Sequence, residues 1–313
     1  MKERYWGGVL VFLGACSFGV LSSIVKTAYK AGYTLGNVTG VQNLFGMLML
    51  WGLYLGYKCF QKSAKNSQSK QTTKNWQVCL TGVFPCLVAI FYYQCVQLVP
   101  ASIAIILLMQ YLWISVIVDF IVFKNKPSFQ QIIAVIIIVG GSILAAGVFN
   151  QDIALNLKGC LFGFLAAITY TLFIITSNRV GTDLPTLKKS ALMITGACIL
   201  GFIIFPPFFL FQFDWHEKIY QWGLLLALLG TVLPPFLFAV GIPKVGISVS
   251  AILTAAELPV AVLASYFYLN ESVYFTQWLG VMVILLAIIC SNLVISKKTS
   301  LRIRKNGFLL KNL

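Results

Sequence analysis

The sequence predicts an all-α membrane protein whose ten transmembrane helices form two inverted five-helix repeats. Three observations predict this fold: ten apolar stretches, a one-sided distribution of basic residues, and a partial likeness between the two halves of the chain. Hydrophobic residues make up 59% of the chain and charged residues only 10%, whereas soluble domains carry about 25% charged residues. This composition is atypical of a soluble domain.

Each apolar stretch is long enough for one crossing, because the ~30 Å hydrocarbon core of a bilayer takes about 20 helical residues. The stretches are continuously apolar, which argues against the alternating strands of a β-barrel. The longest polar stretch, residues 58–75, is too short to build a core of its own. We expect spans at residues 6–27, 34–57, 76–98, 101–123, 128–148, 157–178, 190–210, 218–242, 246–268 and 276–295.

The placement of charge predicts the orientation of these spans. The formal net charge is +15, and 19 of the 23 Lys and Arg residues fall on one side of the ten predicted crossings. The positive-inside rule then places both termini in the cytoplasm of a protein embedded in the cytoplasmic membrane. The basic side chains favour contact with anionic membrane lipid. No folded basic surface for nucleic acid is evident, so we expect no nucleic-acid partner.

An internal repeat predicts the domain organisation. An offset of 146 residues matches Gln131 with Gln277 and Phe129 with Phe275, and an offset of 152 matches Phe18 with Tyr170. Because five is an odd number of crossings, the second copy of the repeat begins on the opposite side of the membrane from the first. The two copies are therefore inverted. We expect a first repeat at residues 1–150, a second at 151–296, and a basic cytoplasmic tail at 297–313.

One region of the second half carries more specific motifs, namely AELPV at residues 256–260, LNES at 269–272 and QWLGV at 277–281. Together with the ten-span layout, these segments resemble the EamA-like ten-helix branch of the drug/metabolite transporter superfamily. The first half departs from that pattern, with QYLW at residues 110–113 and KNKP at 124–127. The resemblance implies solute transport, and the family's substrates include amino acids, other metabolites and toxic compounds.

Glu257 is the leading candidate for substrate binding, because it falls near the middle of the ninth predicted span. A carboxylate at that depth costs about 2.5–3.5 kcal/mol on insertion scales. It must face a wet cavity, pair with a cation or hold a proton; the alternative is a structural carboxylate bound to helix termini near Pro259. Tyr111 matches Glu257 in the repeat, and an aromatic ring opposite a carboxylate would favour an organic cation or a zwitterion.

Other polar or aromatic residues in the spans extend this candidate set. Each has a structural alternative, either aromatic packing or hydrogen bonding between helices. The complete predicted substrate-binding set is Glu257, Tyr111, Trp113, Gln110, Tyr93, Gln97 and Asn43. Prolines in the third, seventh and eighth spans, at residues 85, 206–207 and 234–235, predict bends there.

The function that these features favour is secondary transport of a small organic solute, an amino acid or related metabolite, by alternating access. Proton coupling and exchange both remain open, as do import and export. The chain carries no P-loop motif and no His-Glu-x-x-His or comparable metal motif, so we expect neither an enzyme nor a cofactor or metal. The alternatives are a lipid flippase and a membrane sensor that does not transport. The expected partners are a small-molecule solute and membrane lipid.

Overall fold

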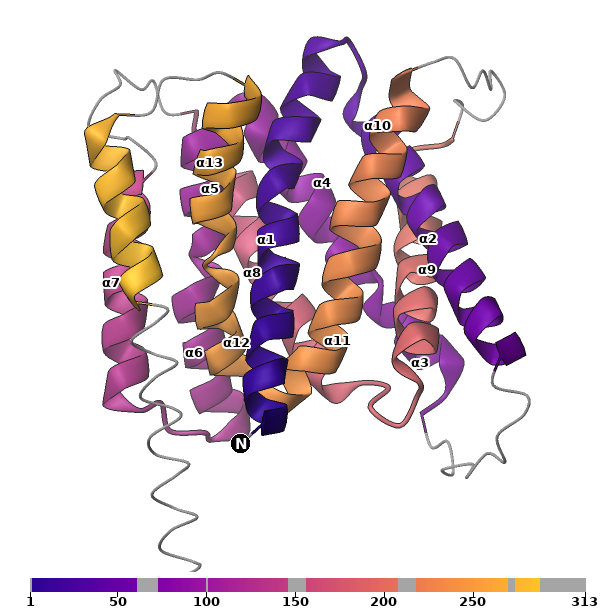
Figure 1. Ribbon diagram of the computed structural model, residues 1–313. Helices are drawn as coiled ribbons and strands as arrows, with labels where there is room; N and C mark the ends of the chain where they lie inside the picture. The colour runs from indigo at the N-terminus through magenta and orange to yellow at the C-terminus, as the bar shows by residue number, and fades with distance from the viewer. Residues whose placement is uncertain are drawn as a thin grey trace, which may run out of the picture.

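A computed structural model describes residues 2–60, 73–99, 101–145, 156–207, 218–269 and 274–287, and these ranges contain helices and no strand (Figure 1). The predicted basic tail at 297–313 lies outside the described residues, as do the ends of the predicted fifth and tenth spans and most of the LNES segment.

Seven of the described helices are apolar and long enough to cross a membrane, and three shorter apolar helices accompany them. The prediction of an all-α membrane protein is therefore confirmed. The long helices are α1 (Lys2–Lys30), α2 (Leu35–Phe60), α3 with α4 (Asn75–Thr81, Val83–Leu98), α5 with α6 (Ala101–Met109, Tyr111–Phe123), α8 (Leu157–Arg179), α9 (Thr186–Ile204), and α10, η4 and α11 (Lys218–Leu226, Ala227–Val232, Leu233–Val245). The shorter ones are α7 (Phe129–Ala145), the pair α12 and α13 (Ile247–Thr254, Glu257–Leu269), and a helix at Phe275–Ala287.

Prolines end or distort two of these helices. Helix α9 stops at Ile204, two residues before the Pro206–Pro207 pair, whereas the sequence predicted that the span continues to residue 210. In the eighth span, Pro234 and Pro235 have no N–H to donate to the preceding turn. The backbone widens there into the π-helical turn η4, which ends at Val232. Such turns often occur at functional sites.

Two spans break at positions that the internal repeat makes equivalent. Helix α5 gives way to α6 at Gln110, and α12 gives way to α13 at Ala255 and Ala256. The offset of 146 residues pairs Gln110 with Ala256. Neither break was predicted from the sequence, although Pro259 lies in the first turn of α13 and has no N–H to donate to the Ala255 carbonyl. Each break begins a new helix inside the span, at Tyr111 and at Glu257.

The helices pack so that segments distant in sequence lie together. Helix α1 packs against α11 and α13, helix α8 packs against α4 and α5, and α2 packs against α9. Figure 1 shows α1 between the α12–α13 column and the α10–α11 column. Helix Phe275–Ala287 lies beside α7, with Gly280 against the Gly141 backbone.

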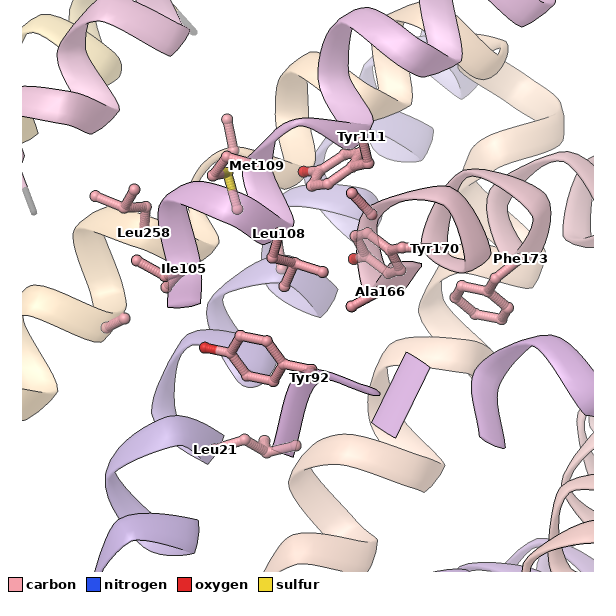
Figure 2. Packing of buried hydrophobic residues seen from close by; sticks show 14 of the residues in the cluster. Leu21, Tyr92, Ile105, Leu108, Met109, Tyr111, Ala166, Tyr170, Phe173 and Leu258 are labelled. Carbon is pink, nitrogen blue, oxygen red and sulfur yellow. The ribbon is translucent and has the colours of Figure 1, made fainter. Parts of the chain in front are cut away.

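A cluster of aromatic side chains, buried except for the half-buried Phe18, lies where α1, α6, α8 and α11 meet. The Tyr170 ring meets the Tyr111 ring edge-on, with the centroids 4.5 Å apart, and meets the Phe18 ring at 6.1 Å. Phe18 in turn lies 5.8 Å from Phe238. Figure 2 shows Tyr111, Tyr170 and Phe173 within this core, with Tyr92 beneath them. The core thus contains tyrosine hydroxyls as well as hydrocarbon.

Candidate functional site

A cavity of about 70 Å³ lies next to this aromatic cluster. We call it the central cavity. Its walls come from α1, α2, α4, α5, α8, α9, η4, α11 and α13, so both halves of the chain contribute. Most of the wall is apolar. The polar residues among the described lining are Gln42, Asn43, Tyr92, Tyr93, Tyr170, Thr231 and Glu257.

Glu257 is the one charged residue among the described lining of the central cavity. Its side chain is 5% exposed, and its Oε2 atom is buried without a hydrogen-bond partner. The break before α13 makes Glu257 the first residue of that helix, where the helix dipole favours negative charge. Helix α1 approaches closely here, since a Cβ on Gly19 would lie 2.5 Å from the Glu257 carbonyl oxygen.

Three further polar atoms around the cavity are buried and lack partners: Asn43 Nδ2, Tyr92 Oη and Tyr170 Oη. An unpaired buried polar atom costs about 1–3 kcal/mol, and native structures contain few of them. Together with the Glu257 Oε2 atom, they provide a carboxylate, an amide donor and two hydroxyls that can bind a solute or water entering the cavity.

Another part of the wall is held by a chain of hydrogen bonds. The Tyr93 hydroxyl donates to Gln42 Oε1 at 3.0 Å, and Gln42 Nε2 donates to Thr231 Oγ1 at 3.1 Å. These bonds connect α4, α2 and the π-turn η4. Thr231 lies in the widened turn before the two prolines, so the distortion of the eighth span brings this hydroxyl to the cavity.

Tyr111 lies behind the wall of the central cavity. It is fully buried, and its hydroxyl donates to Thr254 Oγ1 at 2.8 Å. Tyr111 begins α6 and Thr254 ends α12, so this bond joins the two helix breaks. The ring of Tyr111 contacts Tyr170, which does line the cavity.

The remaining predicted residues lie away from the cavity. Trp113 is 36% exposed and its Nε1 donates to Gln110 Oε1 at 2.8 Å, which places both side chains on the outer face of this span. Gln97 is exposed in the last turn of α4. The structure therefore gathers Glu257, Tyr93 and Asn43 at the cavity, with Tyr111 behind them.

Tyr170 and Thr231 line the cavity but were not among the residues predicted from the sequence. A signal for Tyr170 was present, because the internal repeat aligns it with Phe18 and the two rings are in contact. Thr231 precedes a Pro-Pro pair by three residues. A hydroxyl in a proline-distorted turn is a reasonable candidate for facing a cavity.

The apolar helices, together with the polar side chains buried at the largely apolar central cavity, define an integral membrane protein of the transporter class. The chain belongs to the EamA-like transporter family, whose sequence model matches residues 5–147 and again residues 157–293. The resemblance inferred from the motifs at residues 256–281 is thus confirmed, and the family agrees with the drug/metabolite transporter superfamily. Membership supports a transporter rather than an enzyme.

Two curated relatives and one solved structure agree with this assignment. The chain is 22% identical over 289 residues to the uncharacterized transporter YcbK of Bacillus subtilis (strain 168), covering 90% of each chain. It is 30% identical over 176 residues to the uncharacterized transporter YetK of the same organism, covering 53% of this chain and 52% of YetK. A solved crystal structure is 12% identical, with a TM-score of 0.72, and covers 92% of this chain and 96% of its own; at that identity it supports the fold alone.

Proposed function

We propose that this protein is a secondary transporter that moves a small cationic or zwitterionic organic solute, such as an amino acid or related metabolite, across the cytoplasmic membrane by alternating access. The observation that carries the proposal is the unpartnered Glu257 carboxylate oxygen in the central cavity. An isolated carboxylate in an apolar site needs a cation or a proton. A transported ammonium group supplies the cation.

The cavity walls fit such a solute. A carboxylate binds an ammonium through short charge-assisted hydrogen bonds, and the faces of Tyr170, Phe173 and Phe18 can stabilise a nearby cation. The free N–H of Asn43 Nδ2 can donate to the carboxylate of a zwitterion. At about 70 Å³, the cavity is far smaller than the ~300 Å³ typical of ligand pockets. Substrate entry therefore requires the helices around it to move apart.

The architecture that we propose for this motion is ten spans in two inverted repeats, at residues 1–150 and 151–296. If the two halves are exchanged, the α1–α11 contact becomes the α8–α4 contact, and the α1–α13 contact becomes the α8–α6 contact. The helix breaks at Gln110 and Ala256 support the same relation. Such repeats rock about a central site in known transporters.

Glu257 also provides a route to coupling. With no cation bound, a proton can neutralise its carboxylate in the apolar cavity; a cationic solute can then exchange for that proton. Exchange of one solute for another uses the same site without net proton movement. In both schemes Glu257 carries the charge that makes the carrier selective.

The test is uptake of labelled amino acids and organic amines into proteoliposomes, with and without a pH gradient. Glu257→Gln keeps the shape but removes the charge, and we expect at least a tenfold loss of uptake, together with loss of the thermal stabilisation that the solute gives the unmodified protein. Glu3→Gln, at an exposed position, is the matched control and should behave like the unmodified protein.

Three outcomes would overturn the proposal. Equal uptake and equal thermal shift in Glu257→Gln would make Glu257 a structural residue. Movement of lipid analogues in place of solute would identify a flippase. Solute binding that stabilises the protein without flux under any gradient would identify a sensor.

A further inference from the structure

A second pocket, remote from the central cavity, lies where α1 begins and where α6 and α8 end. It has a volume of about 220 Å³ and a mostly polar wall. We call it the polar pocket. Three basic side chains line it, Arg4, Lys126 and Arg179, against the single acidic side chain of Asp119. The charge of the lining therefore favours an anion.

The loop between α6 and α7 is held in place beside this pocket. Lys124 ends α6 in a left-handed conformation with φ 54°, and Asn125 Nδ2 donates to Asp119 Oδ1 at 3.0 Å. At the start of α7, the Ser128 N–H donates to Gln131 Oε1 at 2.8 Å. These contacts fix the course of the loop and so the position of Lys126 at the pocket.

Arg179 is positioned from the other half of the chain. Its guanidinium carbon lies 3.8 Å from the centroid of the Phe123 ring. This contact holds the side chain near the end of α6 while leaving its N–H groups to bind an anion in the plane of the guanidinium. Phosphate suits that planar group because it can accept two parallel hydrogen bonds.

An apolar groove of about 350 Å³ runs along the outer faces of α6 and α7. We call it the outer groove. Its wall includes the exposed side chains of Ile117, Phe120, Ile132 and Ile136, and almost none of it is polar. Pro127 lines both the outer groove and the polar pocket, so a cationic pocket and a hydrocarbon-facing groove adjoin.

We propose that the polar pocket and the outer groove together bind one anionic phospholipid. The phosphate would contact Lys126 and Arg179, and one acyl chain would follow the outer groove past Pro127. The two surfaces match the two parts of such a molecule in charge and polarity. A free anion would use only the pocket, and an uncharged lipid only the groove. The pocket joins residues of both halves, Lys126 from the first and Arg179 from the second, so the bound lipid bridges them.

The experiment measures lipid binding by native mass spectrometry of the purified full chain, titrated with phosphatidylglycerol and, separately, with phosphatidylcholine. The double variant Lys126→Gln/Arg179→Gln removes two charges from the pocket. Each basic residue near an anionic headgroup contributes about fivefold in affinity, so we expect the preference for phosphatidylglycerol to fall roughly 25-fold. The matched control is Lys58→Gln/Lys74→Gln, which removes two exposed charges outside the pocket and should keep the preference.

A second variant tests the groove without touching the charges. Ile136→Trp, at a side chain that is 65% exposed, fills the outer groove, whereas Ile203→Trp, at 71% exposed, adds the same bulk on α9. We expect Ile136→Trp to weaken phosphatidylglycerol binding and Ile203→Trp to leave it unchanged. The proposal is overturned if the double variant keeps the lipid preference, if its charge-matched control loses as much, or if Ile136→Trp binds the lipid as the unmodified protein does.

Discussion

Two tyrosine hydroxyls near Glu257 differ in one respect: one is hydrogen-bonded and the other is not. This difference predicts different effects on stability when each hydroxyl is removed. The Tyr111 hydroxyl donates to Thr254, whereas the Tyr170 hydroxyl is buried without a partner. Removing a paired hydroxyl loses a hydrogen bond, but removing an unpaired one relieves its desolvation cost. The two rings touch each other, so the comparison is made in one environment.

We therefore expect Tyr111→Phe to lower the free energy of unfolding by about 1 kcal/mol, and Tyr170→Phe to leave it unchanged or to raise it slightly. Unfolding in mixed detergent micelles, followed by tryptophan fluorescence, measures both. We further expect Tyr170→Phe to weaken solute binding, because its hydroxyl is among the groups that we assign to the solute. Equal destabilisation by the two variants would contradict this account.

Sequence reasoning located part of the site for a clear reason. Glu257, Tyr93 and Asn43 are polar residues within apolar spans, and the cost of exposing them to lipid predicts that they face the interior. Gln110 and Trp113 satisfied the same criterion, yet they bond to each other on the outer face of their span. Their neighbour Tyr111 points inward. Only the positions of α8 and α12, which pack on α6, decide between these directions.

At the scale of elements, close contacts between helices depend on residues with no side chain. Gly82 separates α3 from α4, and a Cβ there would overlap the Met193 carbonyl oxygen and lie 2.6 Å from the Ala197 nitrogen. Both partners are backbone atoms of α9, which cannot rotate away as a side chain could. The sequence shows a glycine near Pro85 but not the helix that approaches it.

We expect Gly82→Ala to destabilise the protein by about 1–3 kcal/mol, because the added methyl group forces α4 and α9 apart. Gly52→Ala is the matched control, since nothing lies within 4 Å of a Cβ at that position of α2. Alanine is the better helix former by about 1 kcal/mol, so the control should be neutral or stabilising. Thermal unfolding of both variants in one detergent measures the difference, and a loss of similar size at Gly52 would refute the packing explanation.

The sequence predicted where the helices lie better than it predicted the breaks inside them. Apolar length alone indicates where a span lies, and each described helix overlaps its predicted segment, although several ends differ by a few residues, as at α9, which begins at Thr186 and not at residue 190. The break at Gln110 arises without a proline, whereas the break at Ala255–Ala256 precedes Pro259, which has no N–H to donate to the Ala255 carbonyl. Neither break was predicted from the sequence, and packing against other spans accompanies both. Because the second break places Glu257 at the start of a helix, the feature that the sequence did not predict is also the one that shapes the candidate site.

For the whole molecule, the basic residues predict which end faces the cytoplasm. An exposed cysteine at that end, Cys59, can test this prediction. Thr73, just before α3, meets the connection between α8 and α9, since its N–H donates to Asp183 Oδ2 at 2.8 Å. Cys59 lies exposed near the end of α2. The positive-inside rule assigns this end of the molecule to the cytoplasm.

We expect a membrane-impermeant maleimide to label Cys59 in inside-out vesicles and not in intact cells or right-side-out vesicles. Cysteines 86, 95 and 198 are buried and should react slowly in either preparation. Cys59→Ser, which should lose the rapid labelling, identifies the reacting thiol. Rapid labelling of Cys59 from outside would reverse the orientation of the chain, and would place the polar pocket with Arg4, Lys126 and Arg179 on the outer side of the membrane. Orientation thus decides in which leaflet the proposed lipid site must lie.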